Sequence, residues 1–195
     1  MDQGISLIVG LGNPGAEYAE TRHNAGFRFL GALVKSTAAT FRSEARFGAE
    51  LARMNIAGRD LWLLQPTTFM NRSGDVVARF AQYYKILPPQ ILVAYDELDL
   101  PPGSVRLKQG GGDAGHNGVH DIIEKLGSPD FLRLRIGVGR PPSTGQGATY
   151  VLKKAPRAEQ TLIDAAIDLT CQHLPDIVQG QFQKAMNALH AHVPS

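Results

Sequence analysis

Short apolar runs alternate along the chain with segments of helical periodicity, and the runs predict strands. Residues 5–11 and 91–95 are apolar on both faces, which is typical of central strands in a sheet that is covered on both sides. Residues 48–56 and 61–65 are separated by a turn and predict an antiparallel hairpin. The pattern therefore predicts a sheet with buried central strands and one hairpin.

Two further strands are expected in the second half of the chain. Residues 104–108 lie between loops marked by glycine or proline. Residues 131–139 alternate between apolar and polar positions, so the apolar side chains face one way and Arg133 and Arg135 face the other. We therefore expect these two arginines to form one basic stripe on the sheet.

Helical periodicity appears in five segments: 24–37, 73–85, 119–126, 157–173 and 175–190. The stretch 141–147 is rich in Pro, Gly and Ser and is expected to be a loop. Strands that alternate with helices, together with one hairpin, predict the α/β class. We expect a single three-layer domain over residues 1–195, with a central mixed, mostly parallel twisted sheet flanked by helices.

Composition agrees with a globular protein and excludes several other classes. The chain has 195 residues, of which 43% are hydrophobic, and this proportion is too high for a disordered chain. No apolar run approaches the roughly 20 residues that a membrane span requires. Residues 1–4 lack the basic and apolar regions of a signal peptide. The single cysteine, Cys171, cannot form an internal disulfide. We therefore expect a cytoplasmic protein without a membrane partner.

The basic charge is concentrated in one part of the chain. The formal net charge is +2, yet residues 101–160 carry a clear excess of lysine and arginine over aspartate and glutamate. A basic segment favours a polyanionic partner such as nucleic acid. An ordinary solvated surface explains the charge equally well, so this signal alone does not decide between them.

Dense polar chemistry follows the predicted strands in four loops: 12–24, 67–74, 96–103 and 110–118. In α/β sheets the strand ends at one edge form the crevice in which ligands bind. If the four loops share that edge, six polar side chains converge: His23, Asn13, Asn71, Asp96, His116 and Asn117.

His23 has the chemistry of a general base near neutral pH. A carboxylate such as Asp96 is suited to hold one ring nitrogen, to select the tautomer and to stabilise the protonated ring. The chain has no Gly-x-Ser-x-Gly motif, and Cys171 lies in an amphipathic segment far from the four loops. We therefore expect water to be the nucleophile.

The asparagines admit two interpretations. A side-chain amide near the histidine can donate to a developing oxyanion, an interaction typically worth about 3–4 kcal/mol. Alternatively, Asn71 and Asn117 each precede a predicted helix and could serve only as a turn or cap residue. Phe69 and Met70 allow a similar choice, since they could pack under a sugar or base or could fill the core.

Two other sites are weighed against this hypothesis. Gly10, Gly12 and Gly15 match a dinucleotide-binding fingerprint, but no acidic residue ends a second strand about 20 residues later. His116 and His120, with nearby aspartates and glutamates, suggest a metal-dependent hydrolase. That segment lacks the glutamate of a zincin helix. We expect neither a metal nor another cofactor.

Five motifs in this chain resemble those of the bacterial peptidyl-tRNA hydrolase family. They are Leu-Ile-Val-Gly-Leu-Gly-Asn-Pro-Gly at 7–15, Tyr-x-x-Thr-Arg-His-Asn-Ala-Gly at 18–26, Pro-Thr-Thr-Phe-Met-Asn-Arg-Ser-Gly at 66–74, Asp-Glu-Leu-Asp at 96–99 and Gly-His-Asn-Gly at 115–118. Their order and their span over nearly the whole chain make the resemblance specific.

The resemblance implies an esterase that cleaves the bond between a peptide and the tRNA 3′ ribose. It implies that His23 is the base, that Asp96 supports it and that Asn13 discriminates N-blocked from free aminoacyl-tRNA. Contacts with the tRNA end or the peptide are implied for Tyr18, Phe69, Asn71 and Asn117. Phosphate contacts are implied for Arg106, Lys108 and Arg133.

The resemblance also implies a cytosolic monomer without a cofactor or an obligate protein partner. Two positions depart from the family pattern: Tyr95 precedes the aspartate where histidine is common, and Asp113-Ala114 replaces a frequent His-Gly. An acid at Asp113 is expected to weaken the local attraction for phosphate and to leave the activity intact. The alternative to an enzyme is a module that binds RNA without catalysing a reaction.

Overall fold

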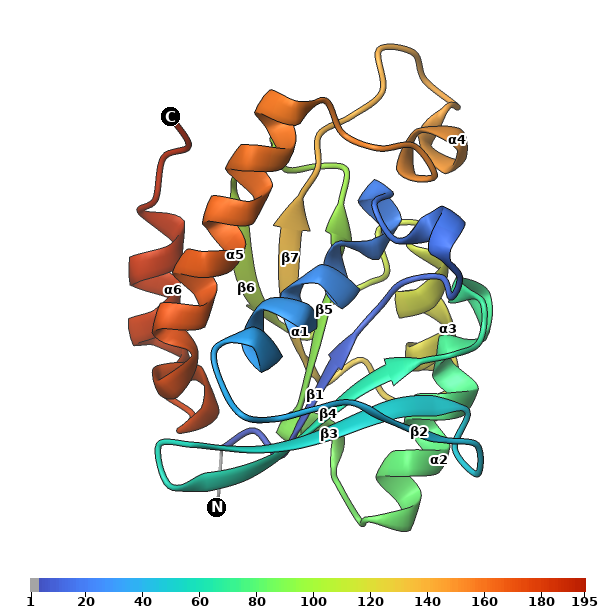
Figure 1. Ribbon diagram of the computed structural model, residues 1–195, viewed down its shortest axis with the longest axis vertical. Coiled ribbons are helices and arrows are strands. Elements are labelled where there is room, and N and C mark those ends of the chain that lie inside the picture. The colour runs from blue at the N-terminus through green and yellow to red at the C-terminus, as the bar shows by residue number, and fades with distance from the viewer. Residues whose placement is uncertain (1–3) are drawn as a thin grey trace.

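Seven strands form one sheet in the order β2-β3-β4-β1-β5-β7-β6 in the computed structural model, which describes residues 4–195 (Figure 1). The strands are β1 (Leu7–Gly10), β2 (Arg42–Glu44), β3 (Ala49–Ile56), β4 (Arg59–Pro66), β5 (Ile91–Glu97), β6 (Val105–Gln109) and β7 (Leu132–Gly137). The central strands β4, β1, β5 and β7 are mutually parallel. β3 and β6 run antiparallel to their neighbours, which confirms the mixed sheet and the predicted hairpin.

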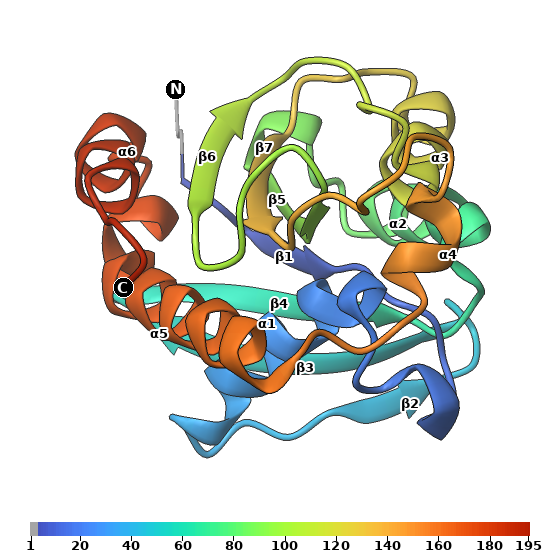
Figure 2. The same ribbon diagram turned by 90° about the horizontal axis from the view of Figure 1, so that it is seen from above.

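Helices cover both faces of the sheet. They are α1 (Ala25–Lys35), α2 (Ser73–Tyr83), α3 (Asn117–Leu126), α4 (Gly147–Val151), α5 (Arg157–Val178) and α6 (Phe182–His190), with 3₁₀ turns η1 (Ala16–Tyr18), η2 (Arg22–Asn24), η3 (Met70–Arg72) and η4 (Pro88–Gln90). Figure 2 shows β1 and β5 between α1 and α5 on one side and α2 and α3 on the other. The α/β class with three layers is therefore confirmed.

The strands β1 and β5 each contribute to two hydrophobic cores. Ile8 and Leu92 pack into the core under α1, α5 and α6, whereas Leu7, Val9 and Val93 pack into the core under α2 and α3. All five side chains are fully buried. Because both faces are covered, these strands need apolar residues at every position, which is the pattern seen in the sequence.

The structure corrects the predicted end of the chain. The helix expected to end at residue 173 continues through Pro175 to Val178, and the next helix begins at Phe182. Proline removes one helical hydrogen bond, but Leu174 and Ile177 are buried in the core on either side of it and keep this turn helical. The break comes at Gly180, whose φ of 82° favours glycine.

Two short elements were not predicted. β2 has three exposed residues, so it lacks the apolar alternation that marks a strand. α4 follows the predicted loop 141–147 and is only five residues long. The absence of a signal peptide was inferred partly from residues 1–3, which lie outside the described residues. Among residues 4–195 no helix is both long and apolar enough to cross a bilayer.

Two glycines bring α1 into direct contact with the sheet. A Cβ on Gly26 would lie 2.3 Å from the carbonyl oxygen of Ala94 and 2.4 Å from the backbone nitrogen of Leu11. A Cβ on Gly10 would lie 2.4 Å from the carbonyl oxygen of Gly26. The start of α1 therefore rests on the ends of β1 and β5, and η2, which precedes α1, is held above the same strand ends.

Gly26→Ala is expected to lower the free energy of unfolding by about 1–3 kcal/mol, because its Cβ meets backbone atoms that cannot move aside. Gly31→Ala is the matched control in the same helix, because a Cβ there meets nothing within 4 Å. It should raise stability by about 0.8–1 kcal/mol through helix propensity. Urea denaturation measures both values, and equal stability of the two variants would contradict the close packing of α1.

Candidate active site

The polar loops that follow β1, β4 and β5 surround one cavity of about 450 Å³. Eight of the residues singled out in the sequence line it: Asn13, His23, Phe69, Met70, Asn71, Asp96, His116 and Asn117. Tyr18, Arg106, Lys108 and Arg133 are not part of its lining. The parallel central strands explain the arrangement, because their carboxyl ends meet at one edge of the sheet.

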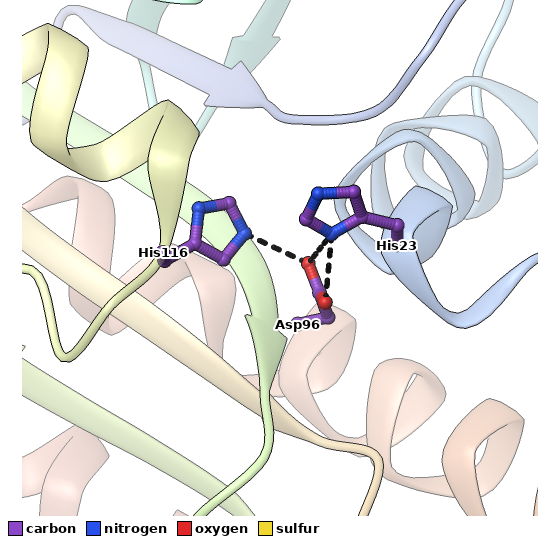
Figure 3. Close-up of side chains that lie close together, drawn as sticks. All are labelled: His23, Asp96 and His116. Atoms are coloured by element: carbon purple, nitrogen blue, oxygen red, sulfur yellow. Dashed lines mark hydrogen bonds and ion pairs between the residues drawn. The ribbon is translucent and has the colours of Figure 1, made fainter. Parts of the chain in front are cut away.

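His23 and Asp96 are in direct contact at the floor of this cavity (Figure 3). Nδ1 of His23 lies 3.0 Å from Oδ1 and 2.9 Å from Oδ2 of Asp96. The Asp96 side chain is 2% exposed and the His23 side chain 12%, so the carboxylate is buried while the ring still reaches the cavity. In Figure 3 Nε2 of His23 lies on the side of the ring away from Asp96. With Nδ1–H donating to the carboxylate, Nε2 is the nitrogen that can accept a proton.

His116 is a second imidazole on the same carboxylate. Its Nε2 lies 2.8 Å from Oδ1 of Asp96, and the ring centroids of His23 and His116 are 5.0 Å apart. Its Nδ1 accepts a hydrogen bond from the backbone N–H of Val119 at 3.3 Å, so His116 is the N-cap of α3. This contact assigns the proton to Nε2, which donates to Asp96. The sequence placed His116 among the converging residues but gave it no role beyond a possible metal ligand.

The charges in this group shift two pKa values in opposite directions. Burial of Asp96 favours the neutral acid, but the adjacent charges and N–H groups of His23 and His116 outweigh it and hold the carboxyl pKa well below its usual range. Burial alone would lower the pKa of His23, but the charge of Asp96 and its hydrogen bond to the ring together outweigh burial and raise the pKa. Asp96 is therefore ionised at neutral pH, and His23 gains affinity for a proton.

Asn13 joins the first loop to the loop after β4. Its backbone N–H donates to Oδ1 of Asn24 at 2.8 Å, and Nδ2 of Asn24 returns a bond to the carbonyl of Asn13 at 2.9 Å. The side-chain Oδ1 of Asn13 accepts from the backbone N–H of Met70 at 2.8 Å. Because Oδ1 is thus engaged, the Nδ2 amide is left without a hydrogen-bond partner among the described residues. Asn24 was not predicted from the sequence, where only its position beside His23 distinguishes it.

The cap interpretation of the two other asparagines is wrong. Asn71 lies within η3, and the residue that caps α2 is Arg72. Asn117 is the first residue of α3, which is capped by His116. Both asparagine side chains are exposed and line the cavity, so they are available to a bound molecule.

Aromatic residues form the outer part of the cavity. Phe69 is 58% exposed, and Tyr18 meets it edge to face with ring centroids 6.3 Å apart. Met70 is buried in the core under α2 and α3, which confirms the core interpretation. It also lines the cavity, and its contact with a sugar or base stays a prediction. Residues of α4 form another wall of the cavity. The Arg22 guanidinium stacks on Tyr150 of α4, 3.7 Å from the ring centroid, and so holds this helix in place.

The basic side chains Lys108, Arg106 and Arg135 on β6 and β7 differ in their exposure and in their partners. Lys108 is exposed. Arg106 donates from Nη1 to the carbonyl of His190 at 3.1 Å, which attaches β6 to the end of α6. Arg135 is paired with Glu97 at 2.8 Å. Of these side chains, only Lys108 is exposed and free of a partner among residues 4–195.

The expectation that Arg133 contacts phosphate from the surface is wrong. Arg133 is 1% exposed, and its guanidinium donates to the carbonyls of Gly111, Gly112 and Pro129. The predicted basic stripe with Arg135 is therefore absent. Sequence alternation separates the faces of a strand, but it cannot show that loop 110–118 folds over this face. Arg133 instead shapes the loop that leads to His116 and Asn117.

The alternative sites do not form as the sequence suggested. The exposed side chain of His120 pairs with Asp113 at 2.8 Å, and His120 is not part of the cavity lining. Another group, His23, Asp96 and His116, has its ligand atoms within 4.8 Å of one another. Both histidines direct a ring nitrogen at the same carboxylate, so a metal would have to replace two hydrogen bonds. The dinucleotide fingerprint does not form a phosphate loop, because Gly10 and Gly12 are packed against α1.

Comparisons with known proteins agree over the whole chain. A family model described as peptidyl-tRNA hydrolase matches residues 7–195. The chain is 51% identical over 191 residues to the peptidyl-tRNA hydrolase of Acinetobacter baumannii strain AYE, covering 98% of each. It is 49% identical over 191 residues to that of Neisseria meningitidis, covering 98% of this chain and 100% of the relative. The crystal structure of peptidyl-tRNA hydrolase from A. baumannii matches with a TM-score of 0.96 at 50% identity, covering 100% of this chain and 98% of the other.

Asp96→Asn is expected to lower the pKa of His23, because the charge that raises it is removed while the burial that lowers it remains. NMR titration of the imidazole resonances measures this change. Asp113→Asn is the matched control: Asp113 raises the pKa of the exposed His120, so this variant should lower the pKa of His120 and leave that of His23 unchanged. A His23 pKa that is the same in wild type and Asp96→Asn would contradict the electrostatic coupling.

Proposed function

The chain belongs to the peptidyl-tRNA hydrolase family, as its five motifs indicated, and from this premise we propose that it hydrolyses the ester between a peptide and the tRNA 3′ ribose. The observation that carries the proposal is the contact between Nδ1 of His23 and Asp96, which leaves Nε2 free at a cavity lined by asparagines. This is the arrangement that a histidine base requires to activate water.

In the proposed mechanism, Nε2 of His23 takes a proton from a water molecule as the water oxygen attacks the ester carbonyl. The imidazolium that forms is stabilised by the ionised Asp96. His116 donates a hydrogen bond to the same carboxylate, so it orients Asp96 and stabilises the negative charge of Asp96. The protonated His23 then gives its proton to the departing ribose oxygen, and peptide and tRNA are released.

The oxyanion needs a donor on the side of the carbonyl away from His23. Asn71 and Asn117 are exposed in the cavity and carry amide N–H groups that can meet this requirement. They come from two different loops, before α2 and at the start of α3. A donor directed at the developing charge typically contributes about 3–4 kcal/mol to the barrier reduction.

Asn13 is suited to distinguish a blocked from a free amino group. Its Oδ1 is held by Met70, so it presents Nδ2, which can only donate a hydrogen bond. An N-blocked aminoacyl group offers a carbonyl that accepts this bond. A free amino group is protonated and offers no acceptor. The buried environment of Asn13 increases the cost of that mismatch.

The remaining parts of the proposal concern the RNA. Phe69 is exposed at the cavity and the half-buried Tyr18 packs against it, and an exposed aromatic face can stack on an unpaired base. Lys108 provides a phosphate contact that does not depend on the nucleotide sequence. Such a contact is needed because many different tRNAs must serve as substrates. We further propose that the protein acts in the cytoplasm as a monomer, without a cofactor or an obligate protein partner.

His23→Ala is expected to lower the rate of hydrolysis of an N-acetylated aminoacyl-tRNA by about 100-fold or more, because the base is lost. The same assay on the unblocked aminoacyl-tRNA tests specificity, and wild type should cleave it poorly. The rate on the blocked substrate should fall in wild type as the pH drops below the raised pKa of His23, since the protonated ring cannot act as a base.

Two controls accompany this assay. Preincubation with EDTA should leave the wild-type rate unchanged, whereas a metal-dependent hydrolase would lose activity. Binding of deacylated tRNA to His23→Ala should equal that of wild type. Unreduced hydrolysis by His23→Ala would overturn the assignment of the base, and tRNA binding by wild type without peptide release would favour a pure binding module.

Lys108→Glu is expected to weaken binding of full-length peptidyl-tRNA while leaving cleavage of a minimal peptidyl-adenosine ester unchanged. Losing one phosphate contact should reduce the slope of log affinity against log salt by about 1. Lys35→Glu, which reverses an exposed charge at the end of α1, is the matched control. Equal losses on the two substrates would show that Lys108 acts on the site itself.

A further inference from the structure

A second hollow lies at the far end of α2 from the catalytic cavity. It has a volume of about 420 Å³ and lies between the sheet edge, the end of α2 and the loop before β2. We call it the arginine–aromatic groove. Its main lining residues are Arg42, Arg46, Phe47, Arg53, Trp62 and Tyr84. None of these residues takes part in the proposed catalytic mechanism.

The floor of the groove is a cluster of aromatic rings. Trp62 packs against Phe80 and Tyr84 with ring centroids 5.4 and 5.1 Å away. Phe47 packs against Phe80 and Tyr83 at 5.1 and 5.5 Å. Tyr83 and Tyr84 remain 56% and 38% exposed, so the cluster is open to solvent at the end of α2. Large aromatic residues left exposed together are a feature of binding surfaces.

Guanidinium groups lie on these rings. The Arg46 guanidinium is 4.2 Å from the centroid of Tyr83 and 4.6 Å from that of Phe47. The Arg53 guanidinium is 4.3 Å from the centroid of Trp62. Arg46 and Arg53 are exposed, as is Arg42 beside them, and none of the three forms a salt bridge within residues 4–195.

This arrangement is suited to phosphate. A guanidinium that rests on a ring has lost part of its rotational freedom before a ligand arrives, and its planar edge presents paired donors that match a phosphate. Glu44 is the single carboxylate in the lining, so the groove carries an excess of positive charge. Rings and guanidinium planes also offer stacking surfaces for unpaired bases. Charge and flat surfaces together favour a nucleic-acid strand over an acidic peptide.

We propose that the arginine–aromatic groove binds RNA through its phosphate backbone, as a surface separate from the catalytic cavity. α2 has 11 residues and so separates the two by about 16 Å. The groove lies at the β2–β3–β4 side of the sheet, whereas Lys108 lies on β6 at the opposite edge (Figure 1). The RNA is the body of the proposed tRNA substrate, so this inference rests on the proposed function, and a separate RNA strand is another outcome of the test.

Trp62 provides a local signal for this binding, because it is the only tryptophan in the chain. Titration with a 12-residue oligouridine and with deacylated tRNA should change Trp62 fluorescence in a saturable way. The double variant Arg46→Glu/Arg53→Glu should bind both probes about tenfold more weakly or worse, with a smaller salt dependence. Lys184→Glu reverses an exposed charge on α6, which contacts β6 at the opposite edge of the sheet, and should bind as wild type does. Thermal unfolding of each variant verifies that it is folded.

Hydrolysis assays test whether the occupant is the tRNA body. The double variant should show a raised KM for full-length peptidyl-tRNA and unchanged cleavage of a minimal peptidyl-adenosine ester. A fall in oligouridine affinity while KM for peptidyl-tRNA stays at the wild-type value would overturn the assignment to tRNA in favour of a separate strand. The proposal is overturned if neither probe changes Trp62 fluorescence, or if the double variant binds both probes as tightly as wild type. The fluorescence readout does not require hydrolysis, so it remains decisive if the proposed function fails.

Discussion

One buried carboxylate, Asp96 at the end of β5, organises the edge of the sheet. A carboxylate with 2% exposure is costly to bury unless N–H donors surround it, and two imidazoles meet this need. The two histidines come from η2 and from the start of α3, which are distant in the chain. The same contacts that compensate a buried charge therefore bring two loops together and leave Nε2 of His23 facing the cavity.

Close packing at glycines and hydrogen bonds hold the loops that carry these histidines. Gly10 and Gly26 let α1 approach the sheet, which places η2 above β5. The paired hydrogen bonds between Asn13 and Asn24 close the first loop. Arg133 binds the carbonyls of the glycine-rich loop before α3. Stability and site geometry are thus supported by the same residues, and a structural substitution among them changes the position of the base.

Much of the architecture was predictable because it follows from local pattern. Strands that are apolar on both faces require helices on both sides, and the polar loops after the parallel strands β1, β4 and β5 share one edge. The fourth polar loop follows β6, which runs antiparallel, so this rule did not determine its place at the site. His23 and Asp96 were found in this way and lie in contact. Burial of long side chains was not predictable in the same way. Arg133 alternates with apolar residues like a surface residue, and only the loop that folds over it shows that its charge is internal.

The sequence pattern was thus sufficient to identify the element types, the central strands and the family. Periodicity and motifs can be recognised from residues that are neighbours along the chain. The path of the chain past Pro175, the second imidazole on Asp96 and the arginines stacked beside Trp62 depend on residues brought together from separate elements. Such contacts arise from packing in three dimensions, so no window of sequence contains them.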